Sequence, residues 1–181
     1  MHASSVTLHT MTCGRLRLPH PFLISGEEGV IEVPVPAFLV VHPRGTVLFD
    51  TGLPVGIRED KARELLAAAP YFEVDFAPGT DLAARLAAAD HDIGRVDYLV
   101  NSHLHFDHAG GLLSTWRDGE DPTLVFDRAT VVVSRAAWER ARHPHPRDRA
   151  SFIAELPALL ERSGRLEVVD GDRSATLGPG Y

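Results

Sequence analysis

Four side chains that commonly bind metals fall within six residues, in the segment His103-Leu104-His105-Phe106-Asp107-His108. In an extended chain, residues two apart point the same way, which would place the first two histidines and the aspartate on one side. The two apolar residues between them would then face a packed interior. The chain must turn before the last histidine can join the others, and Gly110-Gly111 permits a tight turn and a close backbone approach.

Grouped imidazole and carboxylate ligands suit divalent Zn, Fe, Co or Mn. One ion cannot readily use all four side chains of so short a segment. Two ions about 3.5–4 Å apart could, with His103 and His105 on one ion and Asp107 and His108 on the other. A loop that is rich in histidine by chance, or one that caps a helix, is the alternative. The density of ligand types argues against it, so the pattern predicts a metal site.

Other residues with reactive side chains lack such a setting. His143 and His145 could be extra ligands, but a Pro-rich segment between helices favours exposed positions. Cys13, the only cysteine, could be a nucleophile only beside a base, and the sequence provides none. The remaining histidines outside any ligand spacing are His9, His20, His42 and His91.

Composition limits the partners and the compartment. Asp plus Glu is 25 and Lys plus Arg is 18, a net charge of -7, which argues against a nucleic-acid partner and provides no polybasic membrane anchor. No apolar stretch is long enough to span a bilayer, and Met1–Leu8 does not have the pattern of a signal peptide. A single cysteine is compatible with a reducing compartment. We therefore expect a cytoplasmic protein without nucleic-acid or membrane partners.

We call His103–His108 the metal segment. The elements before it are expected to be hairpin-rich. Proline inside a strand removes ladder donors, so Pro34 and Pro36 predict that the second strand begins as an edge or irregular segment. Pro43-Arg44-Gly45 predicts the turn of a hairpin. Arg15–Gly29, rich in Pro, Gly and His, is expected to be a loop. The expected strands are Val6–Thr12, Val30–Val41 and Thr46–Phe49.

Later strands alternate with helices. Pro70 is expected to stop the first helix, Thr80 to cap the second, and Ser163-Gly164 to close the last. The mixture predicts an α/β (α+β) fold, a sheet with helices packed on an outer face. The expected strands are Val96–Val100, Thr130–Val133 and Leu166–Val169. The expected helices are Ile57–Ala69, Asp81–Ala89, Ala136–Arg142 and Ser151–Arg162.

The segment Ser102–Gly111 resembles the His-x-His-x-Asp-His signature of the metallo-β-lactamase superfamily, and looks most like its N-acyl homoserine lactonase branch. Val47–Gly52 resembles the strand and Asp-Thr-Gly turn upstream of that signature, and Val133–Glu139 the strand and helix downstream. Val168–Asp172, followed by Leu177–Gly180, resembles the approach to the next metal-ligand loop. The resemblance implies an αββα sandwich, of which residues 1–181 form the N-terminal part of a single domain.

The resemblance also implies a site and a reaction. It implies two divalent metal ions, with zinc first and Fe, Co or Mn as alternatives, held by His103, His105, Asp107 and His108. Asp50 would have a structural role beside the metals, or would simply close its strand in an Asx-type turn. The implied reaction opens a lactone ring, that of an N-acyl homoserine lactone, by a hydroxide that bridges the ions. Asp107 would be the catalytic residue that takes and delivers the proton.

Two such ions need about six ligand contacts, and the chain offers four ligands. In the resembled family the next ligands come from a Gly-His-Thr-Pro-Gly-His-like loop, so we expect a continuation beyond Tyr181. Phe106 and Ala109 favour a lactone. The metal loop itself does not exclude a thioester, β-lactam, sulfate ester or phosphate ester. A metal-binding fragment without catalysis is a further alternative. The expected partner is a small-molecule lactone or ester, and a homodimer is compatible with the sequence.

Overall fold

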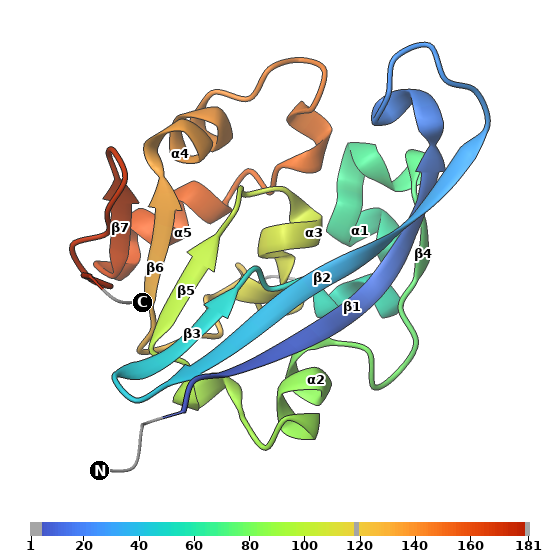
Figure 1. The fold of residues 1–181 in the computed structure, drawn as a ribbon. Helices are drawn as coiled ribbons and strands as arrows, with labels where there is room; N and C mark the ends of the chain where they lie inside the picture. The colour runs from blue at the N-terminus through green and yellow to red at the C-terminus, as the bar shows by residue number, and fades with distance from the viewer. Residues whose placement is uncertain (1–4, 118–119, 180–181) are drawn as a thin grey trace.

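The computed structural model describes residues 5–117 and 120–179, which form one seven-stranded sheet (Figure 1). Its strand order is β4-β1-β2-β3-β5-β6-β7. The pairs of β1 with β2, β1 with β4 and β2 with β3 are antiparallel, whereas β3, β5, β6 and β7 run parallel. The strands are β1 (Thr7–Pro19), β2 (Val30–His42), β3 (Gly45–Phe49), β4 (Glu73–Asp75), β5 (Tyr98–Asn101), β6 (Thr130–Ser134) and β7 (Leu166–Val169).

Helices pack on one face of this sheet, as the order of elements predicts (Figure 1). The α-helices are α1 (Lys61–Leu65), α2 (Leu82–Ala88), α3 (Phe106–Ala109), α4 (Arg135–Arg142) and α5 (Leu156–Ser163). Short 3-10 turns join them: η1 (His20–Phe22), η2 (Val55–Arg58), η3 (Leu66–Tyr71), η4 (Ile93–Arg95), η5 (Gly110–Leu112) and η6 (Arg149–Ser151). Among the described residues, no helix has the length and apolar character needed to cross a membrane.

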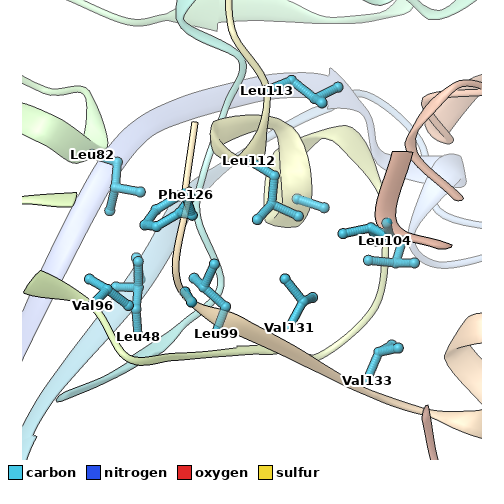
Figure 2. Packing of buried hydrophobic residues seen from close by; sticks show 14 of the residues in the cluster. Leu48, Leu82, Val96, Leu99, Leu104, Leu112, Leu113, Phe126, Val131 and Val133 are labelled. Carbon is cyan, nitrogen blue, oxygen red and sulfur yellow. The ribbon is translucent and has the colours of Figure 1, made fainter. Parts of the chain in front are cut away.

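The main core lies between the sheet and these helices. Strand register aligns Leu39, Leu48, Leu99 and Val131 across four neighbouring strands. Figure 2 shows Leu48, Leu99 and Val131 pointing from the sheet toward Leu112. All are almost completely buried, and each fully buried Leu or Val side chain contributes about 1.5–3 kcal/mol to stability.

A second cluster of buried residues forms where β1 and β2 extend beyond β3 and the parallel strands. Leu16, Leu18 and Val35 from these strands pack with Leu65 and Phe106. Helix α3 therefore touches both cores, because Phe106 belongs to this cluster and Ala109 to the main one. Such two-sided packing holds the metal segment in one position.

The predicted loop Arg15–Gly29 is wrong over its first part, because β1 continues to Pro19. The residues from Arg15 to Leu18 alternate between exposed arginines and buried leucines, which is the pattern of a strand. The start of β2 is an edge segment, as predicted, because residues 30–36 pair with β1 only, whereas β3 pairs with Phe38–His42. Its Pro34 and Pro36 lie opposite Arg15 and Thr12, on either side of a bulge in β1. A bulge interrupts the ladder, so the missing proline donors cost little there.

The predicted helix Ile57–Ala69 is broken into η2, α1 and η3. Leu66, with a φ of 47°, ends α1, and η3 then runs through Pro70 rather than stopping at it. Leu65, Ala68 and Ala69 are all buried in the second cluster. Tertiary packing has therefore overridden a local composition that favours one helix.

Two helix starts differ from prediction. Asp81, not Thr80, caps α2, because its carboxylate accepts a hydrogen bond from the Ala84 amide, whereas the Thr80 hydroxyl donates to the Ala77 carbonyl. Helix α5 begins at Leu156 instead of Ser151, which places Pro157 in the first turn, where its missing N–H is not needed. Gly164 closes α5 in the left-handed conformation, as predicted. Met1–Ser4 and Gly180, on which parts of the predictions rest, lie outside the described residues.

Candidate metal centre

The metal segment lies at the carboxyl ends of two parallel neighbours, β3 and β5. Ligand sites in α/β proteins commonly form at this edge, because loops from adjacent strands converge there. The Asp50 amide donates to the Val100 carbonyl at 2.9 Å, which continues the pairing one step past β3. Asp50 therefore lies beside Ser102, directly before the four candidate ligands.

The chain turns earlier than an extended strand would. Helix α3 begins at Phe106, directly after His105, so Asp107 and His108 both lie on a helical turn. As a result, ligand atoms of His103, Asp107 and His108 all lie within 4.8 Å of one another, and His105 is not part of that group. The expectation that the chain stays extended through Asp107 is therefore wrong, although the rings of His103 and His105 are neighbours, with centroids 4.4 Å apart. Leu104 and Phe106 are buried, as predicted.

The turn that brings His108 into the group is held by its own carbonyl. The His108 carbonyl accepts hydrogen bonds from the Thr51 amide at 2.7 Å, the Thr51 hydroxyl at 3.0 Å and the Asn101 side-chain amide at 3.1 Å. A Cβ atom on Gly111 would overlap the Thr51 carbonyl, and one on Gly110 would overlap Pro54. The predicted close approach at the two glycines is confirmed.

Asp50 contacts both Ser102 and His108. It is buried and adopts a left-handed φ of 57°, which Asp tolerates better than most residues. Its carboxylate accepts hydrogen bonds from the amide and hydroxyl of Ser102, each at 2.8 Å. It also lies 2.8 Å from His108 Nδ1. A carboxylate only accepts, so His108 carries its proton on Nδ1 and turns Nε2 toward Asp107, 3.4 Å away.

Ser102 provides an oxygen acceptor beside His103 Nδ1, as Asp50 does beside His108 Nδ1. Its hydroxyl oxygen lies 3.1 Å from His103 Nδ1 while its proton goes to Asp50. The oxygen can therefore accept the Nδ1 proton of His103 and leave Nε2 unprotonated. Ligating histidines commonly have their second nitrogen bound in this way, since the bond fixes the tautomer and the ring orientation.

The site also shifts the pKa values of its members. Burial lowers the pKa of His103 to about 4, and the charges of His108 and His105 act in the same direction. Burial likewise lowers the pKa of His105. For His108, burial acts downward, but hydrogen bonds to Asp107 and Asp50 outweigh it and raise the pKa to about 9. Burial would raise the pKa of Asp107, yet its hydrogen bond to His108 holds it below the usual value.

These shifts leave Asp107 ionised and His103 and His105 neutral at neutral pH. Those are the forms in which carboxylates and imidazoles bind metals. His108 would give up its proton when a divalent ion takes the place of that charge. The donor set, two imidazoles and a carboxylate in one group with a third imidazole beside it, fits a divalent metal ion.

The other predicted candidates lie elsewhere. His143 and His145 are exposed in the loop after α4, and neither belongs to the group of His103, Asp107 and His108. Cys13 is buried, and burial raises the pKa of its thiol to about 11, so it is protonated and a poor nucleophile.

Sequence reasoning missed Asp148 and Phe152. Asp148 Oδ2 lies 3.7 Å from His105 Nε2, and the ring centroids of His105 and Phe152 are 4.4 Å apart. Both residues come from the segment after the Pro-rich loop, far from the metal segment in sequence. No local spacing could have indicated them.

Comparisons with known proteins agree with this arrangement. A family model described as the metallo-beta-lactamase superfamily matches residues 30–180. The chain is 31% identical over 143 residues to the N-acyl homoserine lactonase AttM of Azorhizobium caulinodans, covering 78% of this chain and 50% of that protein. It is 28% identical over 172 residues to an N-acyl homoserine lactonase of a Bacillus species, covering 91% and 62%.

Solved structures show the same fold. An N-acyl homoserine lactone hydrolase with the product N-hexanoyl-L-homoserine bound at its catalytic metal centre superimposes with a TM-score of 0.71 at 22% identity. The match covers 98% of this chain and 64% of that one, so the chain spans between half and two thirds of the relatives described here. The predicted fold class is confirmed. Because the family model spans most of the chain and includes the whole histidine segment, the chain belongs to the metallo-beta-lactamase superfamily.

Proposed function

We propose that residues 1–181 provide the core of a metal-dependent hydrolase that opens the ring of an N-acyl homoserine lactone. The observation that carries this proposal is a cavity of about 790 Å³ that adjoins the metal group, by which we mean His103, Asp107 and His108. Its polar lining includes His105 and Asp107, together with Arg140, Arg147, Asp148 and Ser151. Leu16, Leu18 and Phe72 line its apolar part, and Phe22 and Tyr71 extend that lining toward the surface. A polar ring attached to an acyl chain matches this division.

The names of the relatives point the same way, since the two curated relatives are N-acyl homoserine lactonases. We propose His103, His105, Asp107 and His108 as metal ligands and Asp50 as the carboxylate that orients His108. Two ions, with zinc first and Fe, Co or Mn as alternatives, are the count and identity that the sequence favours. A bound divalent ion would polarise the lactone carbonyl and lower the pKa of water.

The residues of this chain would then have distinct tasks. His103 and His108, fixed by Ser102 and Asp50, would present Nε2 to the ions. Asp107, ionised and in the same group, would hold the proton of the attacking water and deliver it to the alkoxide leaving group of the ring. The apolar wall of the cavity would bind the acyl chain and exclude water from it.

The experiment tests whether the purified 181-residue protein, with added Zn²⁺, Co²⁺ or Mn²⁺, opens the rings of hexanoyl and decanoyl homoserine lactones. Ring opening is measured by the release of protons. We expect Asp107→Asn and His108→Ala to abolish turnover. His143→Ala, which removes an exposed histidine outside the group, is the matched control and should retain it.

Faster hydrolysis of a thioester, β-lactam, sulfate ester or phosphate ester than of a lactone would replace the substrate class. Bound metal without hydrolysis of any of them would indicate a non-catalytic metal-binding protein. Undiminished activity of Asp107→Asn would refute the assigned role of that carboxylate. The homodimer and the cytoplasmic location stay predictions of the sequence.

A further inference from the structure

The loop after α4 places a carboxylate next to the metal segment. Asp148 follows the Pro-rich run that begins at His143, and its amide donates to the His145 carbonyl at 3.1 Å. Arg140, in the last turn of α4, donates to Asp148 Oδ2 from Nε at 3.0 Å and from Nη2 at 2.7 Å. Two hydrogen bonds from one guanidinium fix the direction of the carboxylate.

The other oxygen of this carboxylate is in an unusual position. Asp148 Oδ1 is buried and has no hydrogen-bond partner within residues 5–117 and 120–179. Buried carboxylate oxygens are normally hydrogen-bonded, so an unpartnered one in a cavity wall calls for a functional explanation. Its partner oxygen, Oδ2, lies 3.7 Å from His105 Nε2, and both residues line the same cavity.

The His105 ring is held so that this edge keeps facing Asp148. It lies edge-on between two rings, with centroids 4.4 Å from His103 at 73° and 4.4 Å from Phe152 at 82°. The backbones of His105 and Phe152 also form an antiparallel bridge. The segment that carries Asp148 and Phe152 is therefore attached to His105 through backbone and ring contacts.

A neutral imidazole carries a proton on one nitrogen only, and a carboxylate can only accept that proton. Asp148 thus favours the form of His105 with the proton on Nε2, which leaves Nδ1 with a free electron pair. Asp50 has this relation to His108 and Ser102 to His103. Each of the three imidazoles then has an oxygen facing one nitrogen, at hydrogen-bond distance for His108 and His103 and at 3.7 Å for His105, and the other nitrogen remains for an ion.

We propose that Asp148, braced by Arg140, is a positioning residue that holds the Nε2 proton of His105 and so directs Nδ1 of His105 to a divalent metal ion. The inference rests on the proposed function only in taking His105 as a metal ligand. The tautomer of the metal-free protein is independent of any catalysis.

The first test is nuclear magnetic resonance of the 181-residue protein, labelled with ¹⁵N-histidine and freed of metal by a chelator, at neutral pH. Long-range proton–nitrogen correlations report which ring nitrogen carries the proton, and His105→Gln assigns the signals. We expect the Nε2–H form for His105. In Asp148→Ala this preference should be lost.

The matched control is Asp170→Ala. Asp170 accepts a hydrogen bond from Arg135 at 2.8 Å, also an arginine of α4, but it is exposed. Arg140→Gln removes the brace while keeping the carboxylate, so it tests the idea even if Asp148→Ala folds poorly. An Nδ1–H form of His105 in the unaltered protein would overturn the proposal, and so would an Nε2–H form that persists in both Asp148→Ala and Arg140→Gln.

The second test is Co²⁺ affinity, measured by competition with a chromophoric chelator. Loss of an outer partner of a ligating histidine typically weakens metal binding about 10–100-fold, so we expect that loss in Asp148→Ala and less than twofold in Asp170→Ala. Equal affinities in the two variants would overturn the proposal. No Co²⁺ binding by the unaltered protein would remove His105 as a ligand and the proposed function with it.

The two ideas fail in different ways. An Nε2–H tautomer and the expected Co²⁺ pattern without lactone hydrolysis would refute the proposed function and leave the positioning role standing. Lactone hydrolysis with an Nδ1–H tautomer would do the reverse.

Discussion

Asp50→Asn isolates the electrostatic role of the carboxylate behind the metal group. The substitution preserves the volume, and asparagine tolerates the φ of 57° at this position. The asparagine carbonyl can still accept from the Ser102 amide, now bound at 2.8 Å. The new amide group, however, would face Ser102 Oγ and His108 Nδ1, both of which give their protons to the present carboxylate.

His108 can accept that amide proton only if its Nδ1 carries no proton, so the remaining proton of the ring lies on Nε2, the atom that faces Asp107. A protonated Nε2 cannot bind an ion. We therefore expect metal affinity to fall about 10–100-fold, or ~1.4–2.8 kcal/mol at about 1.4 kcal/mol per factor of ten. Asp50→Asn should lower the free energy of unfolding by less than Asp50→Ala does. Asp50→Ala leaves two or three donors unpaired at about 1–3 kcal/mol each and also strains the left-handed backbone.

The assay measures Zn²⁺ and Co²⁺ affinity by chelator competition and stability by urea unfolding of the metal-free protein. Asp97→Asn is the control, since Asp97 accepts from the Thr46 amide and from Arg128, each at 2.8 Å, without contacting a histidine. We expect it to lower stability by about 1–2 kcal/mol and to leave metal affinity unchanged. Wild-type metal affinity in a folded Asp50→Asn protein would refute the tautomer argument.

Three further predictions concern stability. Gly111→Ala should destabilise the protein by about 1–3 kcal/mol or more, because its Cβ meets the rigid Thr51 carbonyl. Gly164 has open space around it, so Gly164→Ala should destabilise the protein by only about 1–2 kcal/mol, the cost of its φ of 67°. Equal urea midpoints for Gly111→Ala and Gly164→Ala would contradict the steric overlap at Gly111. The pKa of Asp81 is lowered: burial acts upward, but the hydrogen bond from Arg58 and that from the Ala84 amide outweigh it. The stability this provides is present above the pKa of about 3.9 in the unfolded chain and is lost as pH falls through the lower folded value. Asp81→Ala should thus cost about 1–2 kcal/mol at neutral pH and little in strong acid, and a pH-independent difference would exclude this linkage. Finally, Zn²⁺ at 100 times its dissociation constant should raise the unfolding free energy by about 2.7 kcal/mol and a chelator should remove the gain, whereas an unchanged melting curve would contradict a native metal site.

The elements with strong periodicity could be predicted from sequence. Leu166–Val169 is β7 as expected, and the strands Thr46–Phe49 and Thr130–Val133 differ from β3 and β6 by one residue. Their apolar, β-branched runs are bounded by turn residues, so local signals and burial agree. The errors lie where they disagree. The strand pattern of Arg15–Leu18 is obscured by nearby proline and glycine, and the break at Leu66 is imposed by packing of α1 and η3.

For the site, the sequence by itself determined the ligand types. Four donors in six residues predict divalent metal binding, whatever the fold, because ligand chemistry is a property of the side chains. It also indicated that the two glycines admit a close approach. It could not show that α3 begins right after His105, since that depends on Phe106 and Ala109 entering two separate cores.

Only the tertiary structure shows which acceptors lie beside the ring nitrogens of these histidines, from which we infer the nitrogen that each presents. That choice depends on acceptors brought by other strands and loops: Asp50 after β3 for His108, and Asp148 after α4 for His105. Chain distance hides such partners, because their proximity follows from strand order and helix packing rather than from spacing. The sequence thus predicted a metal site of histidine and aspartate, and the folded sheet decided how those side chains are oriented.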